Sequence, residues 1–282
     1  MEVVFDATAG SLRLGMNLSG RKALLTGATG GLGRAIAQAL AERGARLTLS
    51  ARNREALEAM AAELPGGGHD VLPADLAEPD AAERLAAEAA GTEILIANAG
   101  LPAAGKLADF SPEQVKRALR VNLEAPMLMA QALYPQMLEA GSGHLVFVSS
   151  LAGKAASPRS SIYNATKFGL RGFALGLRGD LNPRGVGVSV VSPGFIRDAG
   201  MFADAGSKAP PGMGTARPEQ VGAAVVKAIE RNRAELTVAP LRQRAATHLA
   251  LVSPSISVRA QSGSLGQKSA EAIAKGHPRD KR

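Results

Sequence analysis

Residues 26–33 read Thr26-Gly27-Ala28-Thr29-Gly30-Gly31-Leu32-Gly33, a glycine-rich turn between two regular elements. The aliphatic run at 22–27 is typical of a β-strand, and the run Arg34-Ala35-Ile36-Ala37 is typical of an α-helix. Such a turn directs backbone N–H groups and the positive end of the helix dipole toward one spot, which suits a pyrophosphate. Glycines permit positive φ angles and a close approach of the ligand to the backbone. The alternative is a tight βα turn with a purely structural role.

Between Arg21 and Pro240 the chain repeats this alternation of short aliphatic runs and longer Ala- and Leu-rich stretches. The pattern is typical of βαβ units around a parallel sheet. We expect one α/β domain, a Rossmann-type doubly wound parallel seven-stranded sheet with helices on both faces. Ser111-Pro112-Glu113-Gln114 has the pattern of a capping box and predicts a helix start at Pro112. The expected strands are 22–27, 46–51, 70–74, 93–98, 143–149, 187–192 and 235–239, and the expected helices are 31–43, 54–64, 79–90, 112–139, 160–181 and 218–232.

The two ends of the chain differ from this domain. Residues 1–19 carry no clear element and are expected to form an irregular lead-in, which leaves 20–240 as the dinucleotide-binding and catalytic domain. Residues 241–282 mix apolar runs with turn residues and are expected to form one or two short helices. Residues 231–282 hold ten Lys or Arg and three acids, a net charge of +7, whereas the other 230 residues hold 23 bases and 22 acids. The net charge of +8 therefore belongs to a basic C-terminal extension.

The composition excludes several kinds of site. The chain has no cysteine, which excludes disulfides, iron–sulfur clusters and a cysteine nucleophile. The four histidines are far apart in the sequence, so we expect no metal site. No stretch approaches the ~20 apolar residues that cross a bilayer, and the first ten residues lack the pattern of a secretory signal. A cytoplasmic protein is therefore expected.

The basic extension has two interpretations. Arg242, Arg244 and Arg259 lie near the apolar run 249–252, and together they could contact an anionic membrane surface. The extension could instead pack against the domain or a partner subunit, with its charges in water. We expect no binding of nucleic acid, because the extension lacks aromatic residues for base stacking and the domain is nearly neutral.

The end of the second strand indicates which dinucleotide the turn would bind. An acid at this position binds the ribose hydroxyls of NAD, whereas the 2′-phosphate of NADP(H) requires a cation. The strand ends Leu49-Ser50-Ala51-Arg52-Asn53, where Ala51 takes the place of the acid. Arg52 therefore favours NADP(H) over NAD(H), unless it is simply a surface arginine.

Tyr163-Asn164-Ala165-Thr166-Lys167 carries a phenol and an ammonium one helical turn apart, on one face. An unperturbed tyrosine (pKa ~10) is a weak catalyst near neutral pH, and a fixed cation nearby favours its phenolate. The alternative is a surface Tyr–Lys pair. Ser150 lies at the end of the fifth strand, at the edge where open α/β sheets bind ligands, and is preferred over Ser149.

Asn122 precedes Pro126 by four positions within the expected helix 112–139. Proline has no N–H, so the main-chain carbonyl of Asn122 lacks its usual helical donor. The carbonyl is then free to hold a water molecule. The alternative is that Pro126 only bends a long helix.

Together these motifs resemble the short-chain dehydrogenase/reductase family, on its TGxxxGxG and YxxxK branch and not on its extended, epimerase-like branch. The resemblance covers about residues 20–240. It implies hydride transfer between a nicotinamide and a carbonyl or secondary alcohol, with Tyr163 as general acid and base. It also implies that Ser150 hydrogen-bonds the substrate oxygen, that Lys167 lowers the tyrosine pKa and binds the nicotinamide ribose, and that Asn122 anchors a water. In this family a dimer or tetramer would form through the helices at 112–139 and 160–181.

The resemblance extends to cofactor contacts along the chain. Asp75 after the third strand matches the family's adenine contact, and Asn98-Ala99-Gly100 matches the turn after its fourth strand. The implied cofactor-binding residues are Thr26, Gly27, Thr29, Gly30, Gly31, Leu32, Gly33, Arg52, Asp75, Leu76, Asn98, Ala99, Gly100, Tyr163, Lys167, Pro193, Gly194 and Ile196.

The chain departs from the family at Asp198, where a threonine usually contacts the cofactor. Residues 199–216 resemble the variable loop that covers the substrate, and Met201, Phe202 and Met213 within it favour a lipophilic ketone or aldehyde. The alternative is that these apolar side chains only hold the loop against the domain and carry no information about the substrate. The rival function is a catalytically weakened NADP(H)-binding sensor or scaffold, but the complete set Asn122, Ser150, Tyr163 and Lys167 favours an enzyme.

Overall fold

The computed structural model describes residues 15–206 and 209–261, so most of the lead-in and residues 262–282 of the extension lie outside the described residues. Seven parallel strands form one sheet in the order β3-β2-β1-β4-β5-β6-β7, which confirms the expected fold class. The strands are β1 Lys22–Thr26, β2 Arg46–Ser50, β3 Asp70–Val71, β4 Ile94–Ala97, β5 Gly143–Val148, β6 Val186–Pro193 and β7 Glu235–Val238. The main helices are α1 Gly31–Ala41, α2 Arg54–Glu63, α3 Ala81–Glu88, α4 Pro112–Leu119, α5 Ala125–Glu139, α6 Ser161–Leu181, α8 Pro218–Glu230, α9 Leu241–Val252 and α10 Pro254–Gln261.

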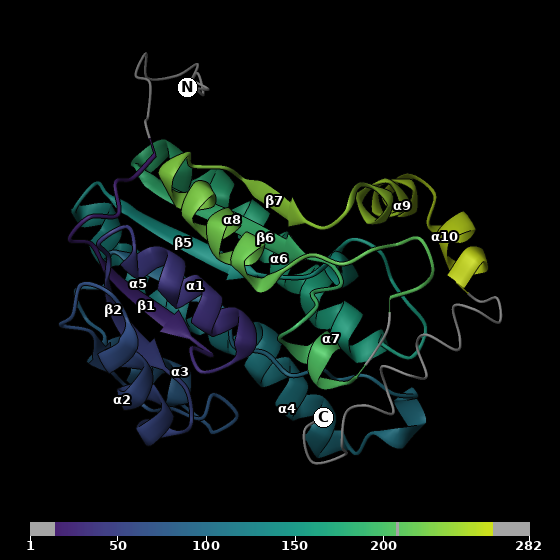
Figure 1. The fold of residues 1–282 in the computed structure, drawn as a ribbon, viewed down its shortest axis with the longest axis horizontal. Coiled ribbons are helices and arrows are strands. Elements are labelled where there is room, and N and C mark those ends of the chain that lie inside the picture. The colour runs from purple at the N-terminus through teal and green to yellow at the C-terminus, as the bar shows by residue number, and fades with distance from the viewer. Residues whose placement is uncertain (1–14, 207–208, 262–282) are drawn as a thin grey trace.

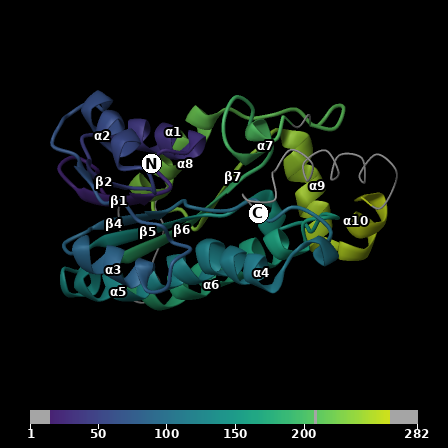
Figure 2. The same cartoon turned by 90° about the horizontal axis from the view of Figure 1, so that it is seen from below.

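Helices cover both faces of the sheet (Figures 1 and 2), with α1, α2 and α8 on one side and α3, α4, α5 and α6 on the other. Successive side chains of a strand point to opposite faces, so neighbouring residues of β1 enter different cores. Leu24 packs in the core on the α3, α5 and α6 side, and Leu25 packs in the core on the α1, α2 and α8 side. Phe147 of β5 meets Phe173 of α6 edge to face, with ring centroids 5.6 Å apart. This aromatic pair holds α6 against the middle of the sheet.

Two expected elements differ from their predicted bounds. The strand expected at 70–74 ends at Val71, just before Leu72-Pro73, although the Leu72 and Ala74 N–H groups still donate to carbonyls of the neighbouring β2 segment at Leu49 and Ala51. The helix expected at 112–139 is also not continuous. Its capping box is confirmed, since Gln114 N donates to Ser111 Oγ and Ser111 N donates to Gln114 Oε1. The interruption comes at the π-helical turn η2, Arg120–Glu124, between α4 and α5.

The π-helical turn carries Asn122 at its centre. The N–H of Ala125 donates to the carbonyl of Arg120, five residues back, and Pro126 follows immediately. Because a proline in the next turn removes a donor and crowds the preceding carbonyls, an ordinary α-helix is strained at this position. Asn122 is completely buried as a result of this packing.

The extension begins with α9 and α10, which lie beyond the carboxyl end of β7 (Figure 1). Gln243, Thr247 and Ala250 are the buried residues of α9, whereas Leu241 and Val252 are exposed. Within the described residues, no helix combines the length and the apolar character that crossing a bilayer requires.

Candidate active site

A cleft of about 1150 Å³ lies at the carboxyl ends of β1, β2 and β4. In the observed strand order the connections reverse direction between β1 and β4, and open α/β sheets bind ligands at such a switch point. The cleft is somewhat larger than a typical drug-sized site, which suits a dinucleotide. The expected cofactor contacts that line it are Thr26, Gly27, Thr29, Gly30, Gly31, Leu32, Gly33, Arg52, Asp75, Leu76, Asn98, Ala99 and Gly100.

The turn between β1 and α1 is shaped by glycines, and a larger residue in their place would force the backbone to move. Gly27 has a φ of +64°, which is the left-handed region. A Cβ on Gly33 would lie 2.1 Å from the Gly27 carbonyl oxygen, so the turn could not close with a larger residue. Gly30 is the N-cap of α1, and the first turn of that helix carries no acidic residue. The turn therefore fits an anion, because it offers N–H groups and a helix N-terminus without a competing carboxylate.

Thr26 and Asn98 connect this turn to the one after β4. The Thr26 hydroxyl accepts from the backbone N–H groups of Asn98 and Ala99, both at 3.1 Å. The Asn98 side chain donates to the carbonyls of Thr26 (3.0 Å) and Gly27 (3.2 Å). Both polar side chains are thus used to fix the floor of the cleft.

The other end of the cleft lies beside β2 and the loop after β3. Arg52 and Arg54 line it, together with Glu55, and Ala51 stands at the position that an acid would take. Asp75 also lines it, and its Oδ1 accepts from the Ala77 N–H at 3.0 Å. This end therefore carries two arginines, of which Arg54 is paired through Nη1 with Glu58 Oε1 at 3.6 Å.

Several lining residues were not among the expected cofactor contacts. Arg117 and Val121 come from α4 and the π-helical turn, and Met201 and Asp204 come from the short helix α7, Met201–Asp204. The spacing of Arg117 and Val121 places them on one helical face, and that face adjoins Asn122. This spacing was the available signal for the first two. Met201 belongs to the loop that was expected to cover the substrate, whereas Asp204 had no comparable signal.

Tyr163, Lys167 and Ser150 come together as expected. Lys167 Nζ lies 5.7 Å from the centroid of the Tyr163 ring, on the same face of α6. The Tyr163 phenol is hydrogen-bonded to the Ser150 side chain. Burial raises the pKa of Tyr163 and this hydrogen bond partly opposes the rise, so the pKa stays above its usual value. Burial lowers the pKa of Lys167 to about 8.

The two neighbouring serines at the end of β5 have different partners. Ser149 Oγ donates to the main-chain carbonyl of Lys167 at 3.1 Å, and Lys167 Nζ donates to the carbonyl of Val148 at 3.0 Å. Ser150 Oγ accepts from the Ala152 N–H and faces Tyr163. Ser149 therefore joins β5 to α6, and Ser150 is the serine beside the phenol.

Asn122 completes this group from the π-helical turn. Its Oδ1 accepts from the Leu101 N–H at 2.6 Å, and its Nδ2 donates to the Leu101 carbonyl at 2.9 Å. A Cβ on Gly100 would lie 3.4 Å from Asn122 Oδ1 and 3.7 Å from Lys167 Nζ. The catalytic candidates thus adjoin the inner end of the cleft at Gly100 without lining it. Met201 Cε lies beside the same glycine, 3.3 Å from that Cβ position.

Three further expected cofactor contacts, Pro193 at the end of β6 and Gly194 and Ile196 just after it, do not line the cleft. The Gly194 N–H donates to the Val238 carbonyl, and the Pro193 carbonyl accepts from Ser150 Oγ at 3.5 Å. Ile196 is buried and pairs with Ala216. Pro193 and Gly194 therefore adjoin Ser150 and its turn, and not the glycine-rich turn.

Asp198 lies in the loop from Phe195 to Gly214, which lines the cleft through Gly200, Met201 and Asp204 and which we call the covering loop. Asp198 has a φ of +70°, and its side chain is 68% exposed and paired with Arg197 at 3.3 Å. Its carboxylate therefore points toward solvent, and the next residue, Ala199, packs against Gly31. Among residues 15–206 and 209–261, no group of three metal-ligating side chains is placed to hold a metal ion.

Gln243 of α9 connects the start and the end of the covering loop. Its Oε1 accepts from the Phe195 N–H at 3.1 Å. Its Nε2 donates to the carbonyls of Met213 (3.2 Å) and Gly214 (2.8 Å). This contact was not expected from the sequence, since a lone glutamine at the start of an extension carries no motif.

The family model described as short chain dehydrogenase matches residues 21–210. The chain belongs to the short-chain dehydrogenase/reductase family. A short-chain dehydrogenase of this type is a Rossmann-fold oxidoreductase, as the motifs implied. The chain is 36% identical to the ketoacyl reductase HetN of Nostoc over 227 residues, which cover 78% of this chain and 79% of that protein.

Two solved short-chain dehydrogenases also resemble this chain. One is the enzyme from Sphingobium yanoikuyae in complex with NADPH, with 30% identity, a TM-score of 0.71, and coverage of 77% of this chain and 87% of that one. The other is a metagenomic short-chain oxidoreductase in complex with NADP, with 32% identity, a TM-score of 0.68, and coverage of 80% and 99%.

Proposed function

We propose that this short-chain dehydrogenase transfers a hydride between NADP(H) and the carbonyl or secondary alcohol carbon of a lipophilic ketone or aldehyde. The observation that carries the proposal is the position of the Tyr163, Ser150 and Lys167 group. It adjoins the inner end of a dinucleotide-sized cleft at Gly100. A binding protein without catalysis would not require a buried phenol paired with an ammonium.

Two features support NADP(H) as the cofactor, with NAD(H) less favoured. Ala51 leaves the end of β2 without an acid, and Arg52 and Arg54 line the cleft beside it. A guanidinium binds a phosphate through paired hydrogen bonds, whereas an acid there would repel the 2′-phosphate. The two solved relatives contain NADPH and NADP. The glycine-rich turn would hold the pyrophosphate.

The roles of the side chains follow from their protonation states. When bound, the nicotinamide supplies or accepts the hydride. Tyr163 keeps its proton at neutral pH because burial raises its pKa, so it can donate that proton to the carbonyl oxygen of the substrate. Lys167, with a pKa of about 8, still carries its charge at neutral pH and stabilises the phenolate that remains. Ser150 hydrogen-bonds the same substrate oxygen, and the Asn122 carbonyl holds the water that returns the proton.

The covering loop supports an apolar substrate. The rings of Phe195 and Phe202 lie 4.8 Å apart, and Met201 and Met213 belong to the same loop. Aromatic and thioether side chains make adaptable apolar walls. Because HetN of Nostoc is named a ketoacyl reductase, a 3-ketoacyl thioester belongs among the compounds to be tested.

The experiment is NADPH oxidation across a panel of ketones, aldehydes and ketoacyl thioesters. The Tyr163→Phe variant should lose at least ~100-fold in kcat on the best substrate while its NADPH affinity stays within about twofold. Tyr134→Phe, the only other tyrosine, is the matched control and should keep full activity. If Tyr163→Phe turns over like the wild type, this site does not perform the reaction. If the wild type binds NADPH but reduces no carbonyl, the protein is a sensor or scaffold.

We further propose a homodimer or homotetramer formed through α4, α5 and α6. Leu119 and Phe168 are large apolar side chains that lie exposed on α4 and α6. Phe168→Asp should lower the mass measured by light scattering to that of a monomer, whereas an unchanged mass would place the subunit contact elsewhere.

A further inference from the structure

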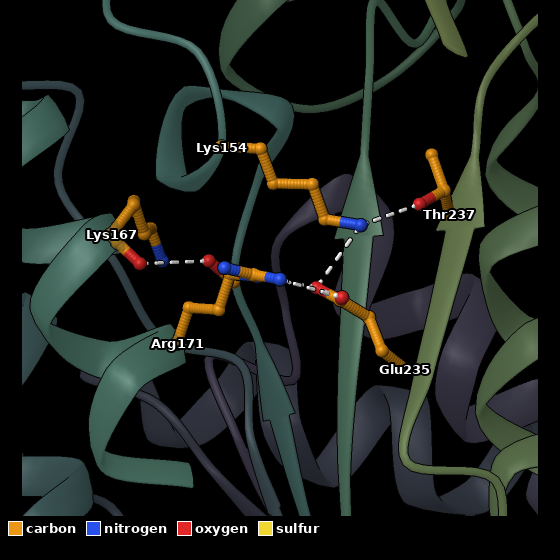
Figure 3. A network of polar contacts seen from close by, with 6 residues as sticks. Lys154, Lys167, Arg171, Glu235 and Thr237 are labelled. Atoms are coloured by element: carbon orange, nitrogen blue, oxygen red, sulfur yellow. Dashed lines mark hydrogen bonds and ion pairs between the residues drawn. The ribbon is translucent and has the colours of Figure 1, made fainter. Parts of the chain in front are cut away.

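Three charged side chains from separate elements meet beside the catalytic group, as Figure 3 shows. Lys154 follows the short 3-10 turn Leu151–Gly153, Arg171 lies on α6, and Glu235 begins β7. Lys154 Nζ lies 3.0 Å from Glu235 Oε1. Arg171 donates to both Glu235 oxygens, from Nε at 2.8 Å and from Nη2 at 3.0 Å. We call Lys154, Arg171 and Glu235 the brace.

The brace is largely removed from solvent. Its side chains are 7%, 24% and 20% exposed for Lys154, Arg171 and Glu235. Lys154 also donates to Thr237 Oγ1 at 2.8 Å. Burial raises the pKa of the Glu235 carboxyl, but hydrogen bonds from Arg171 and Lys154 outweigh this and hold the pKa below its usual value. Glu235 therefore stays ionised and binds both cations.

Such a cluster contributes more to fixing the positions of the elements that it joins than to the free energy of unfolding. The cost of burying ions offsets much of their attraction, so a buried ion pair is weak evidence for a more stable fold. A two-point bond between a guanidinium and a carboxylate is strongly directional, however, and fixes the positions of both partners. The brace is therefore suited to hold its three elements at a defined spacing.

The elements that the brace connects are those that carry the catalytic candidates. Lys154 follows Ser150 by four residues, on the same short turn. Arg171 lies one helical turn after Lys167 on α6, and two turns after Tyr163. Near the brace, Ser149 Oγ donates to the Lys167 carbonyl, and a Cβ on Gly153 would lie 2.6 Å from that carbonyl oxygen. Glu235 thus anchors both the serine turn and the tyrosine helix to one strand.

We propose that Lys154, Arg171 and Glu235 are positioning residues that hold Ser150 in hydrogen-bond contact with Tyr163. The proposal rests on the proposed function for its kinetic consequence but not for its structural one. In the Glu235→Gln variant the shape of the side chain is kept and its charge is lost. Lys154 and Arg171 then face each other across the gap without a counterion, and the serine turn moves away from α6.

The Tyr163 phenol itself distinguishes positioning from a simple charge effect. The hydrogen bond from Ser150 lowers the pKa of Tyr163, so losing this contact raises it. Removing a nearby negative charge with no movement lowers the pKa of a tyrosine, because the phenolate is then less repelled. The two explanations for a Glu235→Gln effect therefore have opposite signs.

The chain allows this measurement directly, because it contains two tyrosines and no tryptophan. In a Tyr134→Phe background, the ultraviolet absorbance of tyrosinate reports on Tyr163 alone as pH is raised, with circular dichroism as a check that the fold persists. Glu235→Gln should move the midpoint to higher pH. The matched control is Glu230→Gln, which breaks the ion pair of Glu230 with Arg43 between α8 and α1 and should leave the midpoint unchanged. A midpoint that stays or falls in Glu235→Gln overturns the proposal.

The kinetic arm uses the best carbonyl substrate. We expect kcat of Glu235→Gln to fall ~10-fold or more, since a misplacement of ~1 Å can cost ~100-fold, while KM for NADPH stays within about twofold. A lower melting temperature with unchanged kcat would assign the brace a merely structural role. If the wild type reduces no carbonyl and the tyrosinate midpoint still rises, the proposed function fails and the positioning proposal stands.

Discussion

The hydroxyl of Thr26 accepts a hydrogen bond from the backbone N–H of Asn98 at 3.1 Å and so joins the two turns on either side of the switch point. Thr26→Val keeps the shape and removes this acceptor, which leaves the N–H groups of Asn98 and Ala99 without a partner. We expect a loss of ~1–3 kcal/mol in the free energy of unfolding in urea, together with weaker NADPH binding. Thr26→Ser keeps the hydroxyl and should behave like the wild type. Equal stability of the Val and Ser variants would contradict this account.

His144 should make the fold sensitive to acid. Ser189 Oγ donates to the Arg233 carbonyl at 2.6 Å. The Ser189 oxygen therefore accepts from His144 Nε2 at 2.8 Å, a hydrogen bond that the neutral imidazole ring can donate. Burial, with a smaller effect from the Arg178 charge, lowers the pKa of His144 to about 3. Because the unfolded chain binds this proton from pH ~6.5 downward, stability falls as pH drops below that value, by about 5 kcal/mol near pH 3.

His144→Gln should flatten this acid dependence when urea unfolding is measured between pH 7 and pH 4. The control is His248→Gln, which changes an exposed histidine on α9 and should keep the wild-type slope. An identical slope in His144→Gln would show that other groups cause the acid sensitivity.

Lys167 should give a dependence of the same sign, with stability rising with pH, but in the alkaline range. Burial lowers its pKa from 10.5 to about 8, so between these values the unfolded chain binds a proton that the folded chain has released. Stability therefore rises with pH in this window, by about 2 kcal/mol between pH 8 and pH 9.5. Lys167→Met should lack this rise and should also lose turnover. A rise of the same size in the variant would mean that Lys167 titrates at its ordinary pKa.

Gly33→Ala should disrupt the glycine-rich turn. The new Cβ would lie 2.1 Å from the Gly27 carbonyl oxygen and 2.6 Å from that of Ala28, which forces the backbone to move. We expect a cost of ~1–3 kcal/mol and at least ~10-fold weaker NADPH binding by fluorescence titration. Gly176→Ala on α6, where a Cβ meets nothing within 4 Å, is the control and should keep full NADPH affinity. Wild-type affinity in Gly33→Ala would remove the turn from the cofactor site.

The alternation of strands and helices, the glycine-rich turn and the pairing of Tyr163 with Lys167 followed from the sequence because each depends on local spacing. Helical periodicity places residues four apart on one face, and a βα turn at the switch point needs glycine wherever backbones touch. The π-helical turn around Asn122 was only partly foreseen. Pro126 indicated a lost hydrogen bond, but how the helix absorbs that loss depends on packing around the buried amide.

Long-range contacts were not visible in the sequence. Glu235 was read as the first residue of a strand, and nothing local indicates that it binds Lys154 and Arg171 from two other elements. Asp198 shows the converse. It stands where a threonine of the family usually contacts the cofactor, but it has a left-handed backbone conformation and its carboxylate points toward solvent. Side-chain direction at such a site is set by tertiary structure and not by residue type.

Gln243 lies beyond residues 21–210, which the family model matches, yet its side chain hydrogen-bonds both ends of the loop from Phe195 to Gly214. Shortening the chain at Pro240 would therefore not produce a minimal enzyme. It would release the loop from Phe195 to Gly214, and we expect the shortened protein to remain folded but to accept a broader range of carbonyl compounds. A change at this one amide should therefore alter the choice of substrate while leaving Ser150, Tyr163 and Lys167 in place.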